Sequence, residues 1–530
     1  MLLVHCNRLV SGVQYPGISS IAAFVKRAGH RVIFFDTAHY TDSRSMESYS
    51  AYRDIKTRID LEFKGIKNKQ LMPSKKPIDI LLWDLENEFA KNRIDIIGFS
   101  SFSDDWPFAL FLIKKVHAIE PNLPIIVGGI HAIVSPEQVI KHDEVSMVCV
   151  GEGEMPIVEL LNSIDAGRID LNIRNLWIRH EGKIIQNPRR PLLAFSENLP
   201  MLDWSLYSGI HFYFPFDGKL YRRGSVFMGR GCPYSCSFCI NNFIKKIYPK
   251  EQGRTYLKSV EYLIKEIVFL KNNYNLEFLR FWDQTFLAMP KGYLSEFAKA
   301  YNKEVRLPFT IETMAQTVTH ENAKMLVTMG CQSVSVGVET SNENLRKNIL
   351  NKPIKNEVYD RCFKILSEYG LRKVANFMFF LPHQTLDDMW EDVSMCKRWG
   401  IDHPSARIFY PYRGTQLREY CLNNDLLDLD LLERIENENA IGEIGNLNEN
   451  HVTFQDTVLK FDNKLKEEGR RLLDNFILFQ ETEESAYVDV RKLLIKNDMD
   501  SNDALRRMER QIYIKRFKEE PLTANYGMNC

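Results

Sequence analysis

The chain has 530 residues, and at roughly 100–200 residues per domain this length predicts several domains rather than one. Hydrophobic residues make up 45% of the chain and charged residues 26%, which excludes wholesale disorder. The 69 basic residues balance the 69 acidic ones, and the resulting net charge of zero argues against a nucleic-acid partner.

The N-terminal sequence, MLLVHCNRLV, has no basic stretch followed by a long apolar run and a small-residue cleavage site, so it does not read as a secretory signal. No segment approaches the roughly 18 uncharged apolar residues that cross a bilayer. The most apolar run, at 374–382, has only the length of a strand. We therefore expect a soluble cytoplasmic protein without a membrane partner.

Residues 1–160 alternate between apolar, strand-like runs and amphipathic, helix-like ones. The expected strands lie at 1–7, 31–36, 94–102, 123–129 and 145–151, and the expected helices at 18–30, 80–92, 106–120 and 151–164. This alternation predicts an α/β domain with a doubly wound parallel sheet of Rossmann-like type. Ligands of such sheets bind at the carboxyl ends of the strands. The polar, lysine-rich stretch 40–75 is interpreted as an insertion or a helical excursion.

The rest of the chain divides into three stretches. Residues 161–222 are interpreted as a connector with a hairpin-like segment at 173–188 and several prolines. Residues 223–415 resume the alternation, with strands expected at 225–230, 277–282, 309–315, 333–338, 374–380 and 406–411. Six such β/α units predict a partial barrel with its chemistry at the carboxyl-end mouth. Residues 416–530 are charged and are predicted to be a mostly helical C-terminal region.

Three of the ten cysteines fall within eight residues. Cys232, Cys236 and Cys239 have the spacing CxxxCxxC in the segment GRGCPYSCSFC, directly after the first predicted barrel strand. Three thiolates can hold three irons of a cubane cluster and leave the fourth iron without a protein ligand. A structural zinc site needs four protein ligands, and only His211 offers a nearby fourth, so zinc fits poorly. The other seven cysteines are scattered singly and are expected to be small buried hydrophobes.

The cysteine loop, its place after the first barrel strand and the aromatic Phe238 before the third cysteine resemble the radical S-adenosylmethionine (radical SAM) superfamily. The resemblance implies a 4Fe-4S cluster on Cys232, Cys236 and Cys239, whose unique iron binds the amino and carboxylate groups of S-adenosylmethionine (SAM). Phe238 then offers SAM a flat apolar face. The resemblance also implies reductive cleavage of SAM to a 5′-deoxyadenosyl radical, with the electron coming from an external low-potential donor of flavodoxin or ferredoxin type.

Two further barrel segments are similar to motifs of this superfamily. The segment SVSVGVETSNENLRK at 333–347 resembles the fourth-strand motif, which implies SAM contacts at Gly337 and Glu339. The segment FWDQTF at 281–286 resembles an acidic second-strand element, which implies a polar contact from Asp283. Glu339 could instead be a helix-capping acid, and Asp283 a structural one. The chain departs from the family pattern at Arg413, where a proline is usual, and around His383, where the usual glycines are absent.

Glycine pairs end two of the strands predicted in the N-terminal region. Gly128 and Gly129 close the strand at 123–129, and Gly151 and Glu152 begin the string GEGE after the strand at 145–151. A missing Cβ lets a large ligand approach the backbone at the carboxyl end of a parallel sheet. Placed ahead of a radical SAM barrel, the full pattern at 127–154 resembles the cobalamin-binding domain of the cobalamin-dependent radical SAM family.

One absence qualifies this resemblance. Cobalamin domains that place a histidine on cobalt carry Asp-x-His-x-x-Gly, whereas here Asp36 and His39 are spaced DxxH. We therefore expect no histidine ligand on cobalt, and we expect His131 to satisfy a backbone group or a phosphate instead. Ser100 and Ser101 lie where a hydroxyl could bind the nucleotide tail of cobalamin, although strand-end capping is an equal alternative.

Taken together, the resemblance implies a methyltransferase that moves a methyl group from methylcobalamin to an unactivated carbon of a small-molecule substrate. An oxidative ring closure or rearrangement with the same cofactors is an alternative, and a non-catalytic cobalamin-binding sensor is another of a different class. The resemblance covers residues 1–415. The helical region 416–530 is interpreted either as a lid over the barrel mouth or as a packing extension.

Overall fold

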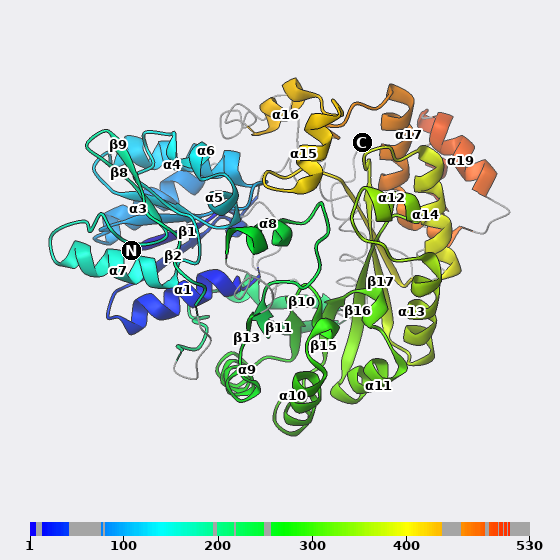
Figure 1. Cartoon of the computed structure of the whole chain (residues 1–530), viewed down its shortest axis with the longest axis horizontal. Coiled ribbons are helices and arrows are strands. Elements are labelled where there is room, and N and C mark those ends of the chain that lie inside the picture. The colour runs from blue at the N-terminus through cyan, green and yellow to red at the C-terminus, as the bar shows by residue number, and fades with distance from the viewer. Residues whose placement is uncertain are drawn as a thin grey trace.

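The fold is taken from a computed structural model of the chain (Figure 1). The structure describes residues 1–6, 13–41, 76–77, 80–193, 199–216, 219–248, 256–436, 457–482, 487–496, 498–501, 503–505 and 507–508. Most of the predicted insertion at 40–75 lies outside these residues, as does Cys530. Two sheets of seven strands each build the core of the described residues.

The first sheet lies in the N-terminal part and has the strand order β2-β1-β5-β6-β7-β8-β9. Its strands are β1 (Leu2–His5), β2 (Ile33–Asp36), β5 (Ile97–Ser100), β6 (Ile125–Gly128), β7 (Met147–Cys149), β8 (Leu176–His180) and β9 (Lys183–Gln186). The first five strands of this order are parallel, as predicted. The hairpin β8–β9, which the sequence places in the connector, is the antiparallel edge of this sheet, because Leu176 and Ile178 are buried beside β7.

Helices cover both faces of the first sheet (Figure 1). They are α1 (Pro16–Arg27), α3 (Leu81–Lys91), α4 (Trp106–Ile119), α5 (Ile130–Val134), α6 (Pro136–Ile140) and α7 (Glu154–Asp165). Successive side chains of a strand point to opposite faces. Accordingly, Leu3 of β1 packs in one apolar cluster with α1 and α7, and Leu2 and Val4 pack in another with α3 and α4. The predicted doubly wound sheet is confirmed.

The second sheet is the partial barrel, with the order β10-β11-β14-β15-β16-β17-β18. Its strands are β10 (Tyr213–Phe216), β11 (Lys219–Val226), β14 (Phe278–Phe281), β15 (Phe309–Thr313), β16 (Cys331–Glu339), β17 (Arg372–Phe379) and β18 (His403–Ile408). From β11 onward all six are parallel, as predicted, and β10 pairs antiparallel with β11. The helices α9 (Val260–Tyr274), α10 (Lys291–Glu304), α11 (His320–Met329), α13 (Asn356–Glu368) and α14 (Leu386–Arg398) lie outside the sheet (Figure 1).

Two strand boundaries of the barrel differ from the sequence prediction. The first strand, expected at 225–230, is β11 at Lys219–Val226, because polar residues at its start hide the alternation. Residues 229–230 instead form a separate short strand, β12 (Gly229–Arg230), which pairs with β13 (Tyr256–Leu257). The last strand, expected at 406–411, lies at His403–Ile408. A further short pair, β3 (Tyr40–Thr41) and β4 (Lys76–Pro77), lies beside the first sheet.

The described part of the C-terminal region is helical, as predicted. It contains α15 (Gln416–Asn423), α16 (Leu429–Glu436), α17 (Asn463–Asp474), α18 (Phe476–Glu481) and α19 (Tyr487–Lys496). Leu472 of α17 and Phe479 of α18 belong to the barrel core, where Phe479 meets the ring of Trp390 at 4.7 Å. These two helices therefore extend the packing of the barrel over α14, whereas α15 and α16 lie toward the first sheet (Figure 1).

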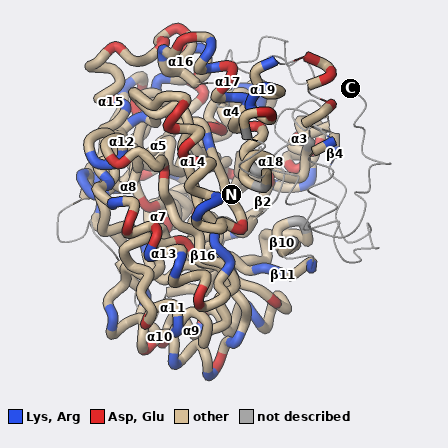
Figure 2. The backbone as a smooth tube through the Cα atoms, turned by 90° about the vertical axis from the view of Figure 1, so that its right-hand side faces the viewer, with Lys and Arg blue, Asp and Glu red and all other residues tan. Residues whose placement is uncertain are grey.

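Charges are mixed over the side of the molecule shown in Figure 2, where Lys and Arg alternate with Asp and Glu along the backbone. No broad region of one sign stands out on that side. This mixture agrees with the balanced composition and offers no extended cationic surface there of the kind that binds nucleic acid. Among the helices of the described residues, none is both long and apolar enough to cross a membrane.

Candidate functional site

The three clustered cysteines lie on one loop between β12 and α8 (Ile240–Ile247). Cys239 is the residue before the first turn of α8, and its N–H donates to the carbonyl of Cys236 at 3.2 Å. All three thiols are free and partly exposed. The six other described cysteines are free and buried, which confirms that those are apolar core residues. Exposure therefore separates the clustered cysteines from the scattered ones.

The cysteine loop is fixed by a residue that the sequence analysis missed. Ser237 is buried, its N–H donates to the carbonyl of Leu350 at 2.9 Å, and its hydroxyl donates to the carbonyl of Ile349 at 2.5 Å. Its own carbonyl accepts from the N–H of Leu417 at 3.0 Å. The loop is thus bound to the segment after β16 and to the start of α15. No local pattern signals these contacts, because the partners lie more than 100 residues away.

The cysteine loop fits an iron–sulfur cubane better than zinc. Within the described residues, no three His, Cys, Asp or Glu side chains are close enough together to hold a single metal ion. A cubane does not need that, because each cysteine binds a different iron. His211, the fourth ligand considered for zinc, is buried and bonded to Asp36 at 2.9 Å. Burial raises the pKa of Cys232 and raises that of Cys236 to about 11, so their thiolates need nearby positive charge.

Glu339 and Gly337 lie at the carboxyl end of β16, near this loop. Lys352 donates to the Glu339 carboxylate at 2.7 Å and to the carbonyl of Gly337 at 2.6 Å. Lys352 is buried, which by itself lowers an amine pKa, but the charge of Glu339 holds the Lys352 pKa above its ordinary value. Its positive charge also lowers the pKa of Cys236. Glu339 is not a capping acid, because Asn342 caps the following helix, α12 (Glu343–Asn348).

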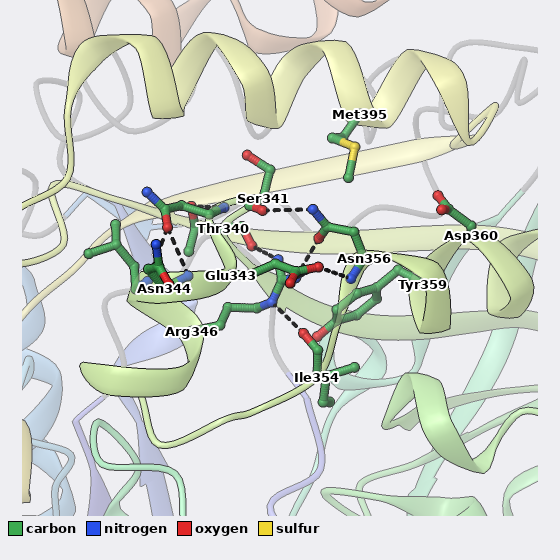
Figure 3. Close-up of polar contacts among 12 residues, drawn as sticks. Thr340, Ser341, Glu343, Asn344, Arg346, Ile354, Asn356, Tyr359, Asp360 and Met395 are labelled. Atoms are coloured by element: carbon green, nitrogen blue, oxygen red, sulfur yellow. Dashed lines mark hydrogen bonds and ion pairs between the residues drawn. The ribbon is translucent and has the colours of Figure 1, made fainter.

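Glu339 has a left-handed backbone with a φ of 73°, which costs energy for a residue with a side chain. The following loop is held by Arg346, which is fully buried (Figure 3). The Arg346 guanidinium donates to the carbonyl of Ile354 at 3.0 Å and also to Thr340 and Asn356. These bonds keep the strained strand end in place.

The Asp283 carboxylate is hydrogen-bonded to main-chain N–H groups in this structure. Asp283 is buried, and its carboxylate accepts the N–H groups of Met228 at 3.0 Å and Gly229 at 3.1 Å. Burial raises the pKa of Asp283 to about 6, although these hydrogen bonds act in the other direction. Asp283 therefore supports the backbone that leads into the cysteine loop. Its predicted contact with a cofactor stays a prediction.

The glycines at the carboxyl edge of the first sheet allow loops to pack closely. Gly129 has a φ of 91°, and a Cβ there would lie 2.6 Å from the carbonyl oxygen of Ser101. At Gly151 a Cβ would lie 2.8 Å from the side-chain amide of Asn175. At Gly128 a Cβ would meet only Cys149, at 3.7 Å, so this position is more open. Loop packing alone explains the first two glycines.

Near the same edge, His131 is buried, stacks on Trp106 at 4.8 Å and contacts the Ser103 hydroxyl through Nδ1 at 3.2 Å. Its Nε2 is buried without a partner, in a cavity that barrel residues Tyr412 and Arg413 also line. Burial, with the charge of Arg413, lowers the His131 pKa to about 3, so the ring is neutral at pH 7. An orphaned nitrogen between the two sheets fits a polar group of a bound ligand.

Ser100 and Ser101 are both placed at this edge. The Ser101 hydroxyl donates to the carbonyl of Phe102 at 2.7 Å, which is a local capping bond. Ser100 contributes its carbonyl to the N–H of Cys6 at 3.3 Å, and its hydroxyl lies close to Gly129. The predicted contact of Ser100 with a cofactor tail stays a prediction.

The two sheets are joined by an ion pair beside the cysteine loop. Arg230, two residues before Cys232, donates to the carboxylates of Glu152 and of Glu154, the latter at 2.5 Å. Ser20 also donates to Glu154, at 2.8 Å. Burial raises the pKa of Glu152, whereas the Arg230 charge holds the pKa of Glu154 below its ordinary value. The string GEGE is thus in direct contact with the approach to the cysteines.

Comparison with known families decides what this arrangement is. The family described as the Radical SAM superfamily matches residues 226–396, and the B12 binding domain matches residues 75–161. The chain is a radical SAM enzyme with a B12-binding domain. Its cofactors are a 4Fe-4S cluster, SAM and cobalamin.

Individual proteins agree with these families. The radical SAM enzyme is 25% identical to an uncharacterized methyltransferase of Pyrococcus horikoshii over 350 residues, which are 66% of this chain and 74% of the relative. The solved structure of OxsB, a cobalamin-dependent radical SAM enzyme, has a TM-score of 0.62 at 14% identity and covers 97% of this chain and 71% of its own. The solved structure of the methyltransferase TsrM of Kitasatospora setae has a TM-score of 0.57 at 15% identity, and the match covers 80% of this chain and 77% of TsrM.

In this radical SAM enzyme, the residues that depart from the family motifs make contacts with the C-terminal helices. Arg413 and Arg418 both pair with Glu436, the last residue of α16. His383 bonds to the hydroxyl of Tyr420 in α15 at 2.8 Å. Phe238 packs against an apolar cluster that includes residues of α15 and α16. The C-terminal region therefore contacts the barrel mouth at each position where the sequence departs from the family pattern.

Proposed function

We propose that this enzyme is a methyltransferase that acts on an unactivated carbon of a small-molecule substrate. The observation that carries the proposal is Arg230, which binds the GEGE loop of the B12-binding domain to the approach to the cysteine loop. When bound, the cluster and SAM supply a radical that removes a hydrogen atom, and cobalamin supplies the methyl group. Both must lie around one cavity for such a transfer.

The residues of the chain provide position and exclude water. Cys232, Cys236 and Cys239 are free to hold the cluster, and Ser237 fixes the loop that carries them. Glu339, held by Lys352, presents a carboxylate at the mouth of the barrel for SAM. α15 and α16 lie at that mouth, where a helical cover would protect a radical from solvent. No side chain has to act as a nucleophile.

An electron donor and a cellular location complete the proposal. A low-potential donor of flavodoxin or ferredoxin type supplies the electron that SAM cleavage requires. We place the reaction in the cytoplasm, because all nine described cysteines are free and disulfides are rare there.

The experiment uses anaerobically purified full-length protein with reconstituted iron, hydroxocobalamin, SAM and a low-potential reductant. It measures 5′-deoxyadenosine, S-adenosylhomocysteine and methylcobalamin. We expect all three, and a variant with Cys232, Cys236 and Cys239 changed to Ala should lose 5′-deoxyadenosine. Deoxyadenosine without S-adenosylhomocysteine would favour ring closure or rearrangement. If protein that holds its cluster forms neither 5′-deoxyadenosine nor S-adenosylhomocysteine, the enzyme proposal is overturned.

A further inference from the structure

Arg223 of β11 points into the barrel. A Cβ on its neighbour Gly224 would meet the side chains of Leu276 at 2.6 Å and Trp204 at 2.8 Å, which belong to the core outside the sheet. Because successive residues of a strand face opposite sides, Arg223 faces the interior. Its guanidinium lies 4.0 Å from the ring centre of Phe214, and it lies close enough to Arg280 of β14 for the two charges to repel.

The Arg223 side chain is buried, with only 6% of its surface exposed, yet it makes no hydrogen bond or ion pair with any described residue. A guanidinium has five N–H donors, and the Nε donor of Arg223 is fully buried without an acceptor. Its neighbour Arg280 is different, because Arg280 bonds to Glu312 at 2.7 Å. The guanidinium groups of Arg223 and Arg280 therefore lie near each other with the Glu312 carboxylate on Arg280, and a third guanidinium, that of Arg372, lies 4.8 Å from the ring centre of Phe216.

A buried, unpaired cation is costly, since it loses its hydration and gains no counter-charge. The cost is visible at Arg223, where burial, with the repulsion from Arg280, lowers the pKa to about 9. Packing does not require a charge there, because an apolar side chain would fill the same volume against Phe214. A ligand that brings a negative charge would remove the cost.

The walls around this guanidinium suit an organic acid. Phe278 of β14 lies 5.4 Å from Phe214 and 5.2 Å from Phe216, which gives an apolar surface beside Arg223. Further along the interior, Asn376 donates to the Ser335 hydroxyl at 2.8 Å and adds a polar wall. Carboxylate and phosphate groups both match the planar fork of arginine with two parallel hydrogen bonds.

We propose that Arg223 binds the acidic group, a carboxylate or a phosphate, of the substrate inside the barrel, with Arg280 as the second cation. The substrate of the enzyme is therefore an organic acid or a phosphate ester. This assignment rests on the proposed function only in taking the barrel interior as the substrate site. SAM is a second source of a carboxylate, and its binding is measured separately.

The test compares full-length wild-type protein with Arg223→Met. Inorganic phosphate and succinate serve as probes, and calorimetry gives the dissociation constant of each. We expect saturable binding of at least one probe to wild type and about tenfold or more weaker binding to Arg223→Met. The matched control is Arg222→Met, which removes the same charge from the other face of β11, where Arg222 donates to the Tyr274 carbonyl. The control should bind the probe like wild type.

A second readout separates a ligand site from a structural residue. Without probe, the thermal midpoint of Arg223→Met should equal or exceed that of wild type, because the variant loses an unpaired buried charge. A lower midpoint, or equal probe binding by the two proteins, would overturn the proposal. A loss of SAM affinity in Arg223→Met would also overturn it, because the acid would then be that of SAM.

The methyltransferase proposal can fail independently of the proposal that Arg223 binds an acidic group. Formation of 5′-deoxyadenosine and methylcobalamin without substrate should be the same in the control Arg222→Met and in wild type. If wild type forms neither, the methyltransferase proposal fails while the anion-binding result stands. If both proteins form them but neither binds the probes, only the substrate assignment is overturned.

Discussion

Two arginines, Arg223 and Arg230, lie seven positions apart at the start of the barrel, and their guanidinium groups differ in what they contact. Arg230 donates to two carboxylates, those of Glu152 and Glu154, and binds the two domains together. Arg223 is more deeply buried, with 6% of its surface exposed against 25% of the Arg230 side chain, but it binds no described residue. The paired arginine is thus the less buried of the two, so the difference lies in the partner. A paired buried cation maintains structure, whereas an unpaired one needs a ligand to balance it.

Replacing Arg230 should have the largest effect on stability. Arg230→Met leaves Glu152 and Glu154 partly buried without a cation, and we expect it to lower the free energy of unfolding by about 3 kcal/mol. Denaturant unfolding of the full chain measures this change. Arg230→Met combined with Glu154→Gln should recover part of the loss, since one uncompensated charge is removed. Full stability in the single variant would show that the ion pair contributes little.

Asp283 is a buried acid that backbone N–H groups satisfy instead of an ion pair. Its pKa is raised to about 6, so the folded chain holds the proton more tightly than the unfolded chain. The stabilising contribution is present below about pH 4 and is lost as the pH rises through about 6, and it amounts to about 3 kcal/mol. Unfolding of wild type and Asp283→Asn from pH 4 to 7 measures it. If the free energy of unfolding falls with pH by the same slope in the two proteins, the predicted contribution of Asp283 is contradicted.

Replacing Arg223 should change the free energy of unfolding in the opposite direction from replacing Arg230. Arg223→Met should raise the free energy of unfolding of the ligand-free protein by about 1 kcal/mol, because it removes an unsatisfied buried cation. The same denaturant series measures this change, with Arg222→Met as the control. A loss comparable to that of Arg230→Met would erase the distinction between the two arginines.

Replacing Ser237 removes a contact between neutral groups in the cysteine loop and should have a similarly small effect on the free energy of unfolding. Ser237→Ala removes the hydroxyl bond to Ile349 and should cost about 1 kcal/mol. The iron content after reconstitution should fall, because the loop that carries the cysteines is held less firmly. Ser235→Ala is the control, since Ser235 is exposed on the same loop. An equal fall in iron for both variants would contradict the role of Ser237.

Much of the fold could be predicted from the sequence because strands and helices follow from local patterns of apolar and polar residues. The alternation of apolar strands with amphipathic helices predicted the parallel part of both sheets, and the six expected barrel strands correspond to the six parallel strands of a seven-stranded sheet. Boundaries failed where composition hides the pattern, as in β11, whose first residues are polar. The hairpin β8–β9 was recognised, but its place at the edge of the first sheet depends on pairing with β7.

The candidate site divides in the same way. The spacing of Cys232, Cys236 and Cys239 within eight residues predicted a cubane cluster, and the resemblance of that loop to the radical SAM superfamily implied the chemistry. Which partners hold that loop, and which charges near it are balanced, could not be read from the sequence. Ser237, Lys352 and Arg230 each look ordinary there. Their roles depend on contacts with distant segments.

The sequence by itself determined the two-sheet architecture, because periodicity is a local property of a chain, and its motifs indicated the cofactor chemistry through their resemblance to a known family. Only the tertiary structure decided that Arg230 meets two carboxylates from another domain and that Arg223 meets none. The physical reason is that the energy of a buried charge depends on the groups that folding brings to it, and those groups come from positions far along the chain.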